Sequence, residues 1–196
     1  MHWAAYLLLA FLSGSVPFSW LLGKIKGVDL REHGSGNPGA TNLLRTCGTA
    51  MGVAGLLLDA VKGAAPVFIA TSSASPEPWL PGAAVLSAIL GHVFMPWFGF
   101  RGGKGVATAL GALLVLAPLP VLCGLGVFLV LVALFRMISL GSVLGGISLP
   151  LWGLLFSQPG YSMTVLAAVA LAIVATHRKN IGRILSGTER KLGGKE

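Results

Sequence analysis

The sequence has 196 residues, of which 55% are hydrophobic and only 10% charged, and its mean hydropathy is +0.84. A chain this apolar carries too few polar residues to cover a water-soluble domain, so the composition predicts an integral membrane protein. The 14 Lys and Arg against 6 Asp and Glu give a net charge of +8. These cations form no dispersed basic surface, so no nucleic-acid partner is expected, and anionic lipids or small anionic substrates fit better.

The hydropathy pattern predicts apolar helices over residues 3–22, 48–71, 81–98, 106–117, 119–135, 140–156 and 161–176. We therefore expect an all-α, polytopic membrane protein with about seven transmembrane helices, in a single integral-membrane domain over residues 1–196. Several of these segments are shorter than the ~20 residues that cross the hydrocarbon core comfortably. The pair of segments that meets at Pro118 and Pro120 could instead form a re-entrant hairpin, which would leave five full spans.

The positions of the basic residues predict how the chain is oriented, because Lys and Arg in short loops stay in the cytoplasm. All but Lys62 fall in alternate connections on one side, and the opposite connections have none. The pattern predicts an N-terminus outside and a C-terminus in the cytoplasm, with or without the hairpin. The residues on the basic side are Lys24, Lys26, Arg31, Arg45, Arg101, Lys104, Arg136, Arg178, Lys179, Arg183, Arg190, Lys191 and Lys195.

Two features inside the predicted spans stand out from the apolar background: a pair of charged residues and two regular spacings of glycine. Asp59 and Lys62 lie three residues apart on one helix face, where unpaired charges are costly, so they are predicted to pair with each other or to line a polar cavity. The spacings Gly48-xxx-Gly52 and Gly141-xxx-Gly145 place small residues one turn apart. They are interpreted as sites where helices pack closely.

The first polar segment, residues 31–45, is dense in turn-forming and hydrogen-bonding residues. Three glycines fall within residues 34–39, and Thr41 or Asn42 could cap a helix that runs on through Arg45. A helix N-terminus with a nearby Arg is a ready phosphate site. The alternative is an ordinary flexible loop on the cytoplasmic side.

The second polar segment, residues 91–108, places Arg101 and Lys104 in a tight glycine turn that opens the next helix. This turn is not a nucleotide-binding P-loop, because Gly105 follows the lysine where Ser or Thr should bind magnesium. His92 lies about two helical turns inside the membrane interface. A lone histidine there is interpreted as a buried hydrogen-bonding residue and not as a catalyst.

The third polar segment is the tail, residues 176–192. If the last helix continues beyond Thr176, His177 and Asn180 share one face. The alternative is a basic tail that only holds topology and contacts anionic lipid. A smaller polar patch, residues 136–139 with Ser142 beyond it, is expected on the same side of the membrane.

Together the three segments offer cations, backbone donors and hydroxyls but few carboxylates. This pattern suits substrates that carry phosphates, and it argues against a metal-dependent mechanism, which needs clustered Asp, Glu or His. A mechanism in which a substrate phosphate accepts the proton therefore becomes attractive.

The chain resembles the bacterial acyl-phosphate-dependent glycerol-3-phosphate acyltransferases. The resemblance is carried by residues 34–42, 91–108 and 177–189, which occur in the family's order, and it covers essentially the whole chain. It implies transfer of a fatty acyl group from acyl phosphate to the first hydroxyl of glycerol 3-phosphate. The products would be lysophosphatidic acid and phosphate, in the first committed step of phospholipid biosynthesis.

The resemblance also implies which residues act. Glycerol 3-phosphate would be held by Ser35, Arg45, Lys104, His177 and Asn180. The acyl-phosphate end would be surrounded by Gly39, Ala40, Thr41, Asn42, Gly102, Gly103 and Ser142. The implied partners are acyl phosphate, glycerol 3-phosphate and membrane lipids, with no cofactor, no metal and no obligate protein partner. The implied location is the bacterial inner membrane, with the active site facing the cytoplasm.

The main alternative is a membrane transporter or channel for an anionic metabolite. Such a protein would place its substrate residues near the bilayer midplane and would show an internal repeat. Here the polar residues crowd one side of the membrane and the sequence has no repeat. The pattern therefore favours an enzyme that works at the membrane surface.

Overall fold

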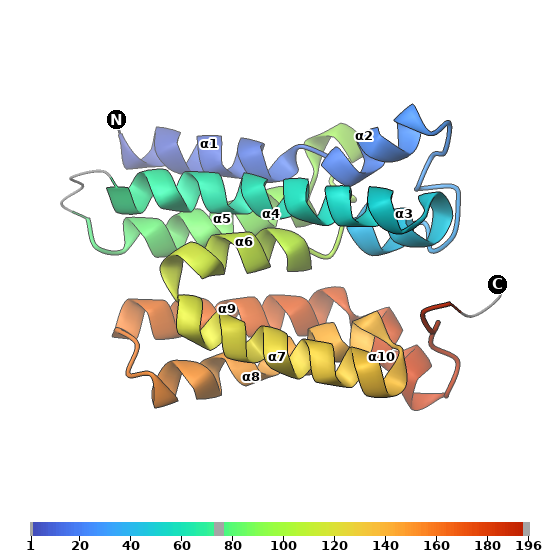
Figure 1. The fold of residues 1–196 in the computed structure, drawn as a ribbon. Helices are drawn as coiled ribbons and strands as arrows, with labels where there is room; N and C mark the ends of the chain where they lie inside the picture. The colour runs from blue at the N-terminus through green and yellow to red at the C-terminus, as the bar shows by residue number, and fades with distance from the viewer. Residues whose placement is uncertain (1, 73–76, 194–196) are drawn as a thin grey trace. The chain divides into compact units, whose positions relative to one another are not determined.

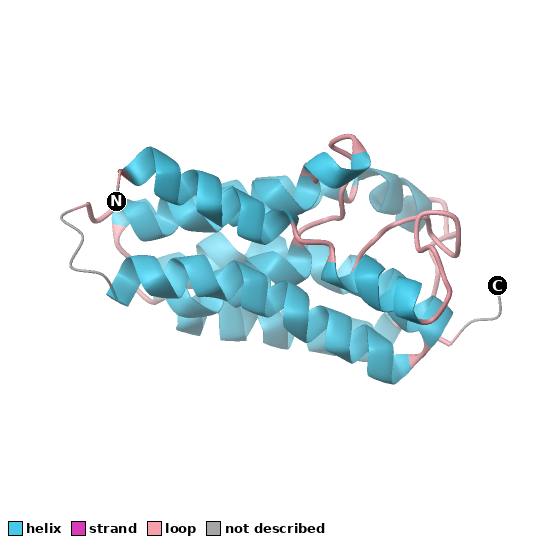
Figure 2. Ribbon diagram, turned by 90° about the horizontal axis from the view of Figure 1, so that it is seen from above, coloured by secondary structure: helices cyan, strands magenta, loops and turns pink. Residues whose placement is uncertain are grey.

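The computed structural model describes residues 2–72 and 77–193, and every regular element within these ranges is a helix (Figure 2). The predicted all-α class is therefore confirmed. The chain divides into two compact units, residues 1–116 and residues 117–196 (Figure 1). That one functional domain spans both units stays a prediction.

The first unit contains six α-helices and one short 3-10 turn in the described residues. In chain order these are α1 (Trp3–Ser15), α2 (Phe18–Ile25), α3 (Ala40–Cys47), α4 (Thr49–Ser72), α5 (Leu80–Val93), η1 (Pro96–Phe98) and α6 (Val106–Leu116). Helix α1 packs along α5, and α4 packs along α6. Helices α2 and α3 lie together at the end of this unit opposite the N-terminus (Figure 1).

The hydropathy pattern predicted a single helix for the first span, but the structure has two helices there, α1 and α2. The span breaks at Val16 and Pro17, because proline has no N–H to donate and its ring clashes with a continuing helix. A buried lysine of α4 compensates, since Lys62 Nζ donates a hydrogen bond to the Val16 carbonyl at 2.6 Å. The break redirects α2 and positions the loop that follows it.

A second proline, Pro66, lies inside α4. It cannot donate to the carbonyl of Lys62, four residues earlier, and an unsatisfied carbonyl within a membrane is costly. The Ser13 hydroxyl of α1 donates to that carbonyl at 2.8 Å. The hydrogen bond missing from α4 is thus replaced by a contact that joins α1 to α4.

Glycines allow these helices to touch backbone to backbone. A side chain at Gly14 or Gly91 would collide with the opposite backbone where α1 meets α5, at Ala88 and Phe11 respectively. A side chain at Gly63 would likewise collide with the Thr108 carbonyl, where α4 meets α6. Close approach of this kind is how membrane helices gain packing energy without a hydrophobic driving force.

The second unit consists of α7 (Pro118–Phe135), α8 (Ile138–Leu155), α9 (Gly160–Thr176) and α10 (Arg178–Leu185). Helix α8 packs against both α7 and α9. The predicted packing role of Gly141 and Gly145 is confirmed, because side chains there would collide with Phe128 and Gly124 of α7. For Gly48 the same prediction is wrong, since it lies between α3 and α4 at a positive φ of 89° with open space around it.

Five helices or helix pairs of the described residues are long and apolar enough to cross a membrane, and a sixth is added if α9 and α10 count as one bent span. The predicted number was about seven; against six the difference is α6, which has only 11 residues, and against five it is α6 and α9. At 1.5 Å per residue, 11 residues reach about half the hydrocarbon thickness. The second arm of the alternative hairpin, α7, has 18 residues and is itself a candidate span.

Basic residues gather at one end within each unit. In the first unit they lie from the end of α2 through α3 and in the turn before α6; in the second they lie in the α7–α8 connection, in α10 and in the tail. Lys62 is the exception in α4. Residues 73–76 of the predicted external loop and Lys195 lie outside the described residues, and the assignment of each side to cytoplasm or exterior stays a prediction.

Candidate active site

The first polar loop is held together by the side chain of Asn42. This residue is 1% exposed. Its Oδ1 accepts a hydrogen bond from the Ser35 backbone N–H at 2.9 Å, and its Nδ2 donates to the carbonyls of Leu30 and His33 at 2.9 and 3.0 Å. One amide thus fixes three points of the loop and sets where Ser35 lies.

The structure corrects how α3 begins. Thr41 and Asn42 were predicted as possible N-caps, but the N-cap is Gly39, which has no side chain to accept from the helix. Asn42 lies inside the first turn and its side chain reaches back into the loop. The predicted course of the helix through Arg45 is confirmed, because Arg45 lies in the last turn of α3; phosphate binding there stays a prediction.

A buried carboxylate anchors the beginning of the same loop. Asp29 is 7% exposed and accepts hydrogen bonds from the Trp20 indole at 2.9 Å and from Arg31, whose guanidinium reaches it at 2.8 Å; Lys24 lies 3.0 Å away. The pKa of the Asp29 carboxyl lies well below its ordinary range, chiefly because of the hydrogen bonds from Arg31, which outweigh the effect of burial. Asp29 is therefore ionised and structural.

Arg31 connects this loop to the second polar segment. Its guanidinium lies 5.4 Å from the ring centre of Trp20 and 4.8 Å from that of Phe98, and the two rings meet edge to face. Phe98 ends η1, directly before the glycine turn. Cation–π contacts of this kind hold the two segments together within the first unit.

The glycine turn, residues 99–105, is anchored by its backbone to the end of α5. Gly102 N–H donates to the Val93 carbonyl at 2.9 Å, and Gly103 N–H donates to the His92 carbonyl at 3.0 Å. The turn ends at Gly105, whose positive φ of 79° favours glycine, and α6 begins at Val106. The prediction that the Lys104 segment opens a helix is confirmed, but the tight turn lies just before it, where Arg101 N–H donates to the Phe98 carbonyl, and residues 101–105 follow as an irregular segment.

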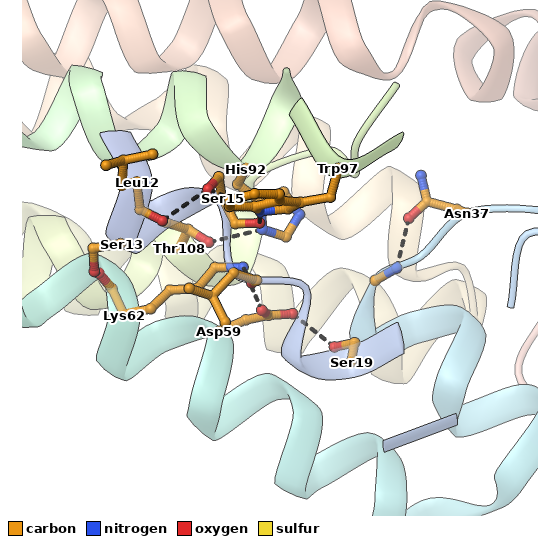
Figure 3. A network of polar contacts seen from close by, with 12 residues as sticks. Leu12, Ser13, Ser15, Ser19, Asn37, Asp59, Lys62, His92, Trp97 and Thr108 are labelled. Carbon is orange, nitrogen blue, oxygen red and sulfur yellow. Dashed lines mark hydrogen bonds and ion pairs between the residues drawn. The ribbon is translucent and has the colours of Figure 1, made fainter. Parts of the chain in front are cut away.

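Polar residues behind this turn form a buried network (Figure 3). Lys62 Nζ lies 2.6 Å from Asp59 Oδ1, so the predicted pairing is confirmed, and Asp59 Oδ2 accepts from the Ser19 hydroxyl at 2.6 Å. His92 Nδ1 lies 3.0 Å from the Thr108 hydroxyl. The interpretation of His92 as a buried hydrogen-bonding residue is confirmed.

In the second unit, Glu189 organises the tail. It is 6% exposed. Its Oε1 accepts from Ser139 Oγ at 2.7 Å and from Asn180 Nδ2 at 2.6 Å, and its Oε2 accepts from Arg183 Nε at 2.7 Å. Burial by itself raises the pKa of the Glu189 carboxyl, but the hydrogen bonds from these three residues outweigh it and leave the pKa lowered. This ionised carboxylate fixes Asn180.

His177 lies where the chain bends by 63° between α9 and α10. Its Nδ1 lies 2.8 Å from the Ile173 carbonyl, which can only accept, so Nδ1 carries the proton. In the neutral ring Nε2 is then the accepting nitrogen. His177 is 2% exposed and Ser142 is 6% exposed, and the Ser142 hydroxyl donates to the Ile138 carbonyl of its own helix at 2.8 Å.

The candidate residues therefore fall into two sets. The first unit carries the residues of the first loop and the glycine turn, namely Ser35, Gly39, Ala40, Thr41, Asn42, Arg45, Gly102, Gly103 and Lys104. The second unit carries Ser142, His177 and Asn180. Sequence reasoning missed the anchoring roles of Asp29 and Glu189. The available signal was that both are acidic residues within basic segments.

The comparisons with known proteins agree on one family. A family model described as glycerol-3-phosphate acyltransferase matches residues 4–187. The glycerol-3-phosphate acyltransferase of Trichlorobacter lovleyi is 46% identical over 93% of this chain and 93% of its own. That of Geobacter sulfurreducens is 43% identical over 93% and 94%.

A solved structure agrees as well. The integral membrane glycerol 3-phosphate acyltransferase PlsY (YgiH), in its glycerol 3-phosphate form, matches with a TM-score of 0.93 and 37% identity over 98% of this chain and 96% of that chain. Its lysophosphatidic acid form matches with a TM-score of 0.91 and 36% identity. The chain therefore belongs to the glycerol-3-phosphate acyltransferase family of integral membrane proteins.

Proposed function

We propose that this glycerol-3-phosphate acyltransferase takes its acyl group from acyl phosphate. The first hydroxyl of glycerol 3-phosphate attacks the acyl carbon, the bond from that carbon to the phosphate oxygen breaks, and lysophosphatidic acid and inorganic phosphate form. The solved relative named with glycerol 3-phosphate and lysophosphatidic acid forms supports this acceptor and this product.

The observation that carries the proposal is that the three buried carboxylates of the described residues are all engaged; the third, Asp59, is paired with Lys62 and Ser19. Asp29 and Glu189 are ionised and hydrogen-bonded to cations and donors, so neither is available as a general base. Acyl phosphate is an activated donor whose departing phosphate can itself accept the hydroxyl proton. Positioning and charge stabilisation then suffice for the reaction.

The residues of the first unit receive the following roles. Lys104, on the backbone-anchored turn, stabilises the charge that develops on the carbonyl oxygen and the departing phosphate. Arg45 clamps the acceptor phosphate through its two-pronged guanidinium. Ser35 holds glycerol 3-phosphate from the loop that Asn42 fixes. Gly39, Ala40, Thr41, Asn42, Gly102 and Gly103 surround the acyl-phosphate end.

In the second unit, His177 and Asn180 contribute to holding glycerol 3-phosphate, and Ser142 contributes to the acyl-phosphate end. The reaction proton goes to a substrate phosphate and not to His177. If kcat depended on pH through the titration of one histidine, and this pH dependence disappeared in His177→Gln, the assignment would be contradicted. The protein acts in the bacterial inner membrane from its cytoplasmic face, without an obligate protein partner.

The test is transfer by the purified protein in lipid vesicles, with acyl phosphate, labelled glycerol 3-phosphate and no other protein. We expect label in lysophosphatidic acid, a fall of that product by about 100-fold or more to a low but measurable rate in Lys104→Ala, and little change in Lys26→Ala. Lys26 is an exposed lysine of the α2–α3 loop and is the charge-matched control. A folded protein that forms no product from acyl phosphate would overturn the proposal.

A further inference from the structure

His92 contacts the chain on both sides of Lys104: it meets Gly103 of the glycine turn and Thr108 of the helix that follows. It lies in the last turn of α5 and is 3% exposed. Its Nδ1 meets the hydroxyl of Thr108, in the first turn of α6, at 3.0 Å (Figure 3). Its own backbone carbonyl accepts from Gly103 N–H at 3.0 Å. Lys104 lies between these two attachment points.

The imidazole ring also determines how closely the turn packs. A Cβ added at Gly103 would collide with His92 Nε2, so the ring lies directly against the Gly103 backbone. Gly102 is packed in the same way, because a Cβ there would collide with the His92 carbonyl. The glycine turn is thus in van der Waals contact with the His92 ring at Gly103 and with the His92 backbone at Gly102.

The far side of this contact is rigid as well. Thr108 is fully buried, and its carbonyl lies against Gly63 of α4 so closely that no side chain fits there. The hydroxyl that His92 meets is therefore held by a helix-to-helix contact. A shift of the ring would have to be taken up by the turn, which has glycine on both sides of Lys104.

We propose that His92 is a positioning residue for Lys104, acting through Gly103 and Thr108 and not by contact with substrate. The inference rests on the role proposed for Lys104. The imidazole ring determines how far the glycine turn lies from the end of α5, and the hydrogen bond to Thr108 fixes the orientation of the ring. A misplacement of about 1 Å at a reacting group can cost on the order of 100-fold in rate.

The test is a double-mutant cycle between His92→Asn and Lys104→Ala. Asparagine keeps a polar atom near the position of Nδ1 but removes the ring atoms that lie against Gly103. We expect His92→Asn to lower kcat/KM by about 10- to 100-fold when Lys104 is present, and by less than about twofold in Lys104→Ala. An equal loss in both backgrounds would show that His92 acts independently of Lys104 and would overturn the inference.

Two further variants keep the test decisive if His92→Asn folds poorly. Thr108→Val replaces the hydroxyl with a methyl group of similar size and is expected to lower kcat/KM several-fold with the same dependence on Lys104. Ser87→Ala, also in α5 but more than one helical turn before His92, removes a 2.7 Å hydrogen bond to the Leu7 carbonyl of α1. It is expected to lower the unfolding temperature without changing kcat/KM. Equal loss of activity in Ser87→Ala and Thr108→Val would contradict the positioning role.

A second measurement uses the same variants but needs no catalysis. It is the rise in unfolding temperature that glycerol 3-phosphate produces in each variant. The rise is expected to shrink in both His92→Asn and Lys104→Ala, and the double variant should show the same rise as Lys104→Ala alone. Failure of the proposed function is recognised separately, because the wild-type protein would then form no lysophosphatidic acid from acyl phosphate. A fully active wild type with an equally active His92→Asn would overturn this inference only.

Discussion

At the scale of single residues, two buried acidic side chains hold segments of the candidate site in place. Asp29 fixes Trp20 and Arg31, and Glu189 fixes Asn180 and Arg183. Each carboxylate accepts hydrogen bonds from several neighbouring donors, so both the buried charge and the donors have hydrogen-bond partners. Hydrogen bonds to a buried charge are among the stronger ones in proteins, so these hubs make their neighbours rigid.

Glu189→Gln tests the tail hub. The amide keeps one oxygen acceptor but loses the ion pair with Arg183, so we expect a loss of about 1–3 kcal/mol in the free energy of unfolding. We also expect kcat/KM to fall by about tenfold, because Asn180 is no longer held in place. The measurements are unfolding in detergent and the transfer assay. Glu32→Gln, at an exposed loop carboxylate, is the control and should change neither.

The same carboxylate predicts an acid-sensitive contribution to stability. Because the pKa of Glu189 is lower in the folded protein than its ordinary value of 4.5, its ionised form stabilises the fold at neutral pH. This contribution is fully present above pH 4.5 and is lost as the pH falls through the lowered pKa. The difference in unfolding temperature between wild type and Glu189→Gln should therefore be constant near neutral pH and shrink in acid. A difference that grows in acid would contradict the lowered pKa.

At the scale of elements, the helix breaks are repaired by side chains from neighbouring helices. Lys62 donates to the Val16 carbonyl at the α1–α2 break, and Ser13 donates to the carbonyl that Pro66 leaves without its helical partner. Asp59 balances the lysine charge at 2.6 Å and holds Ser19 of α2. The buried pair thus determines the direction in which α2 leaves α1.

This role predicts how variants of the pair behave. Lys62→Met leaves the buried Asp59 without its cation, and breaking a buried pair in this way costs about 3–5 kcal/mol. Adding Asp59→Asn removes the uncompensated charge, so the double variant should unfold at a higher temperature than Lys62→Met. If the double variant lost the sum of the two single losses, Asp59 and Lys62 would not be coupled.

At this scale, the sequence predicts features that depend on neighbouring residues and misses features that depend on contacts between distant segments. Hydropathy is local, so the helices around Asp59 and around residues 119–135 could be placed to within a few residues. The break at Pro17 was missed because the hydropathy stays high across it and its compensation comes from Lys62, far along the chain. The role of Asn42 was missed for the same reason, since its partners are loop carbonyls that only the folded chain brings together.

At the scale of the whole molecule, this is an integral membrane protein of the glycerol-3-phosphate acyltransferase family. Within each unit the basic residues and the candidate residues lie in the same connections, and long apolar side chains such as Leu57 and Leu129 are exposed on the spans. Apolar surface on a span faces lipid, whereas cations in short loops stay on the cytoplasmic side. The chemistry is accordingly expected at the cytoplasmic surface.

Cysteine labelling in cells tests this orientation. In a background with Cys47→Ala and Cys123→Ala, we expect Lys26→Cys and Lys191→Cys to react with a membrane-impermeant thiol reagent only after the inner face is exposed. Gln158→Cys should react in intact cells. The reverse pattern would contradict the predicted orientation.

The donor is tested most directly by the phosphate balance of the reaction. The purified protein in lipid vesicles receives acyl phosphate labelled in its phosphate, together with unlabelled glycerol 3-phosphate, and release without glycerol 3-phosphate is subtracted. We predict one labelled inorganic phosphate for each lysophosphatidic acid, no label in the lipid, and no product when acyl-coenzyme A replaces acyl phosphate. Product formed from acyl-coenzyme A but not from acyl phosphate, or label found in the lipid, would contradict the account.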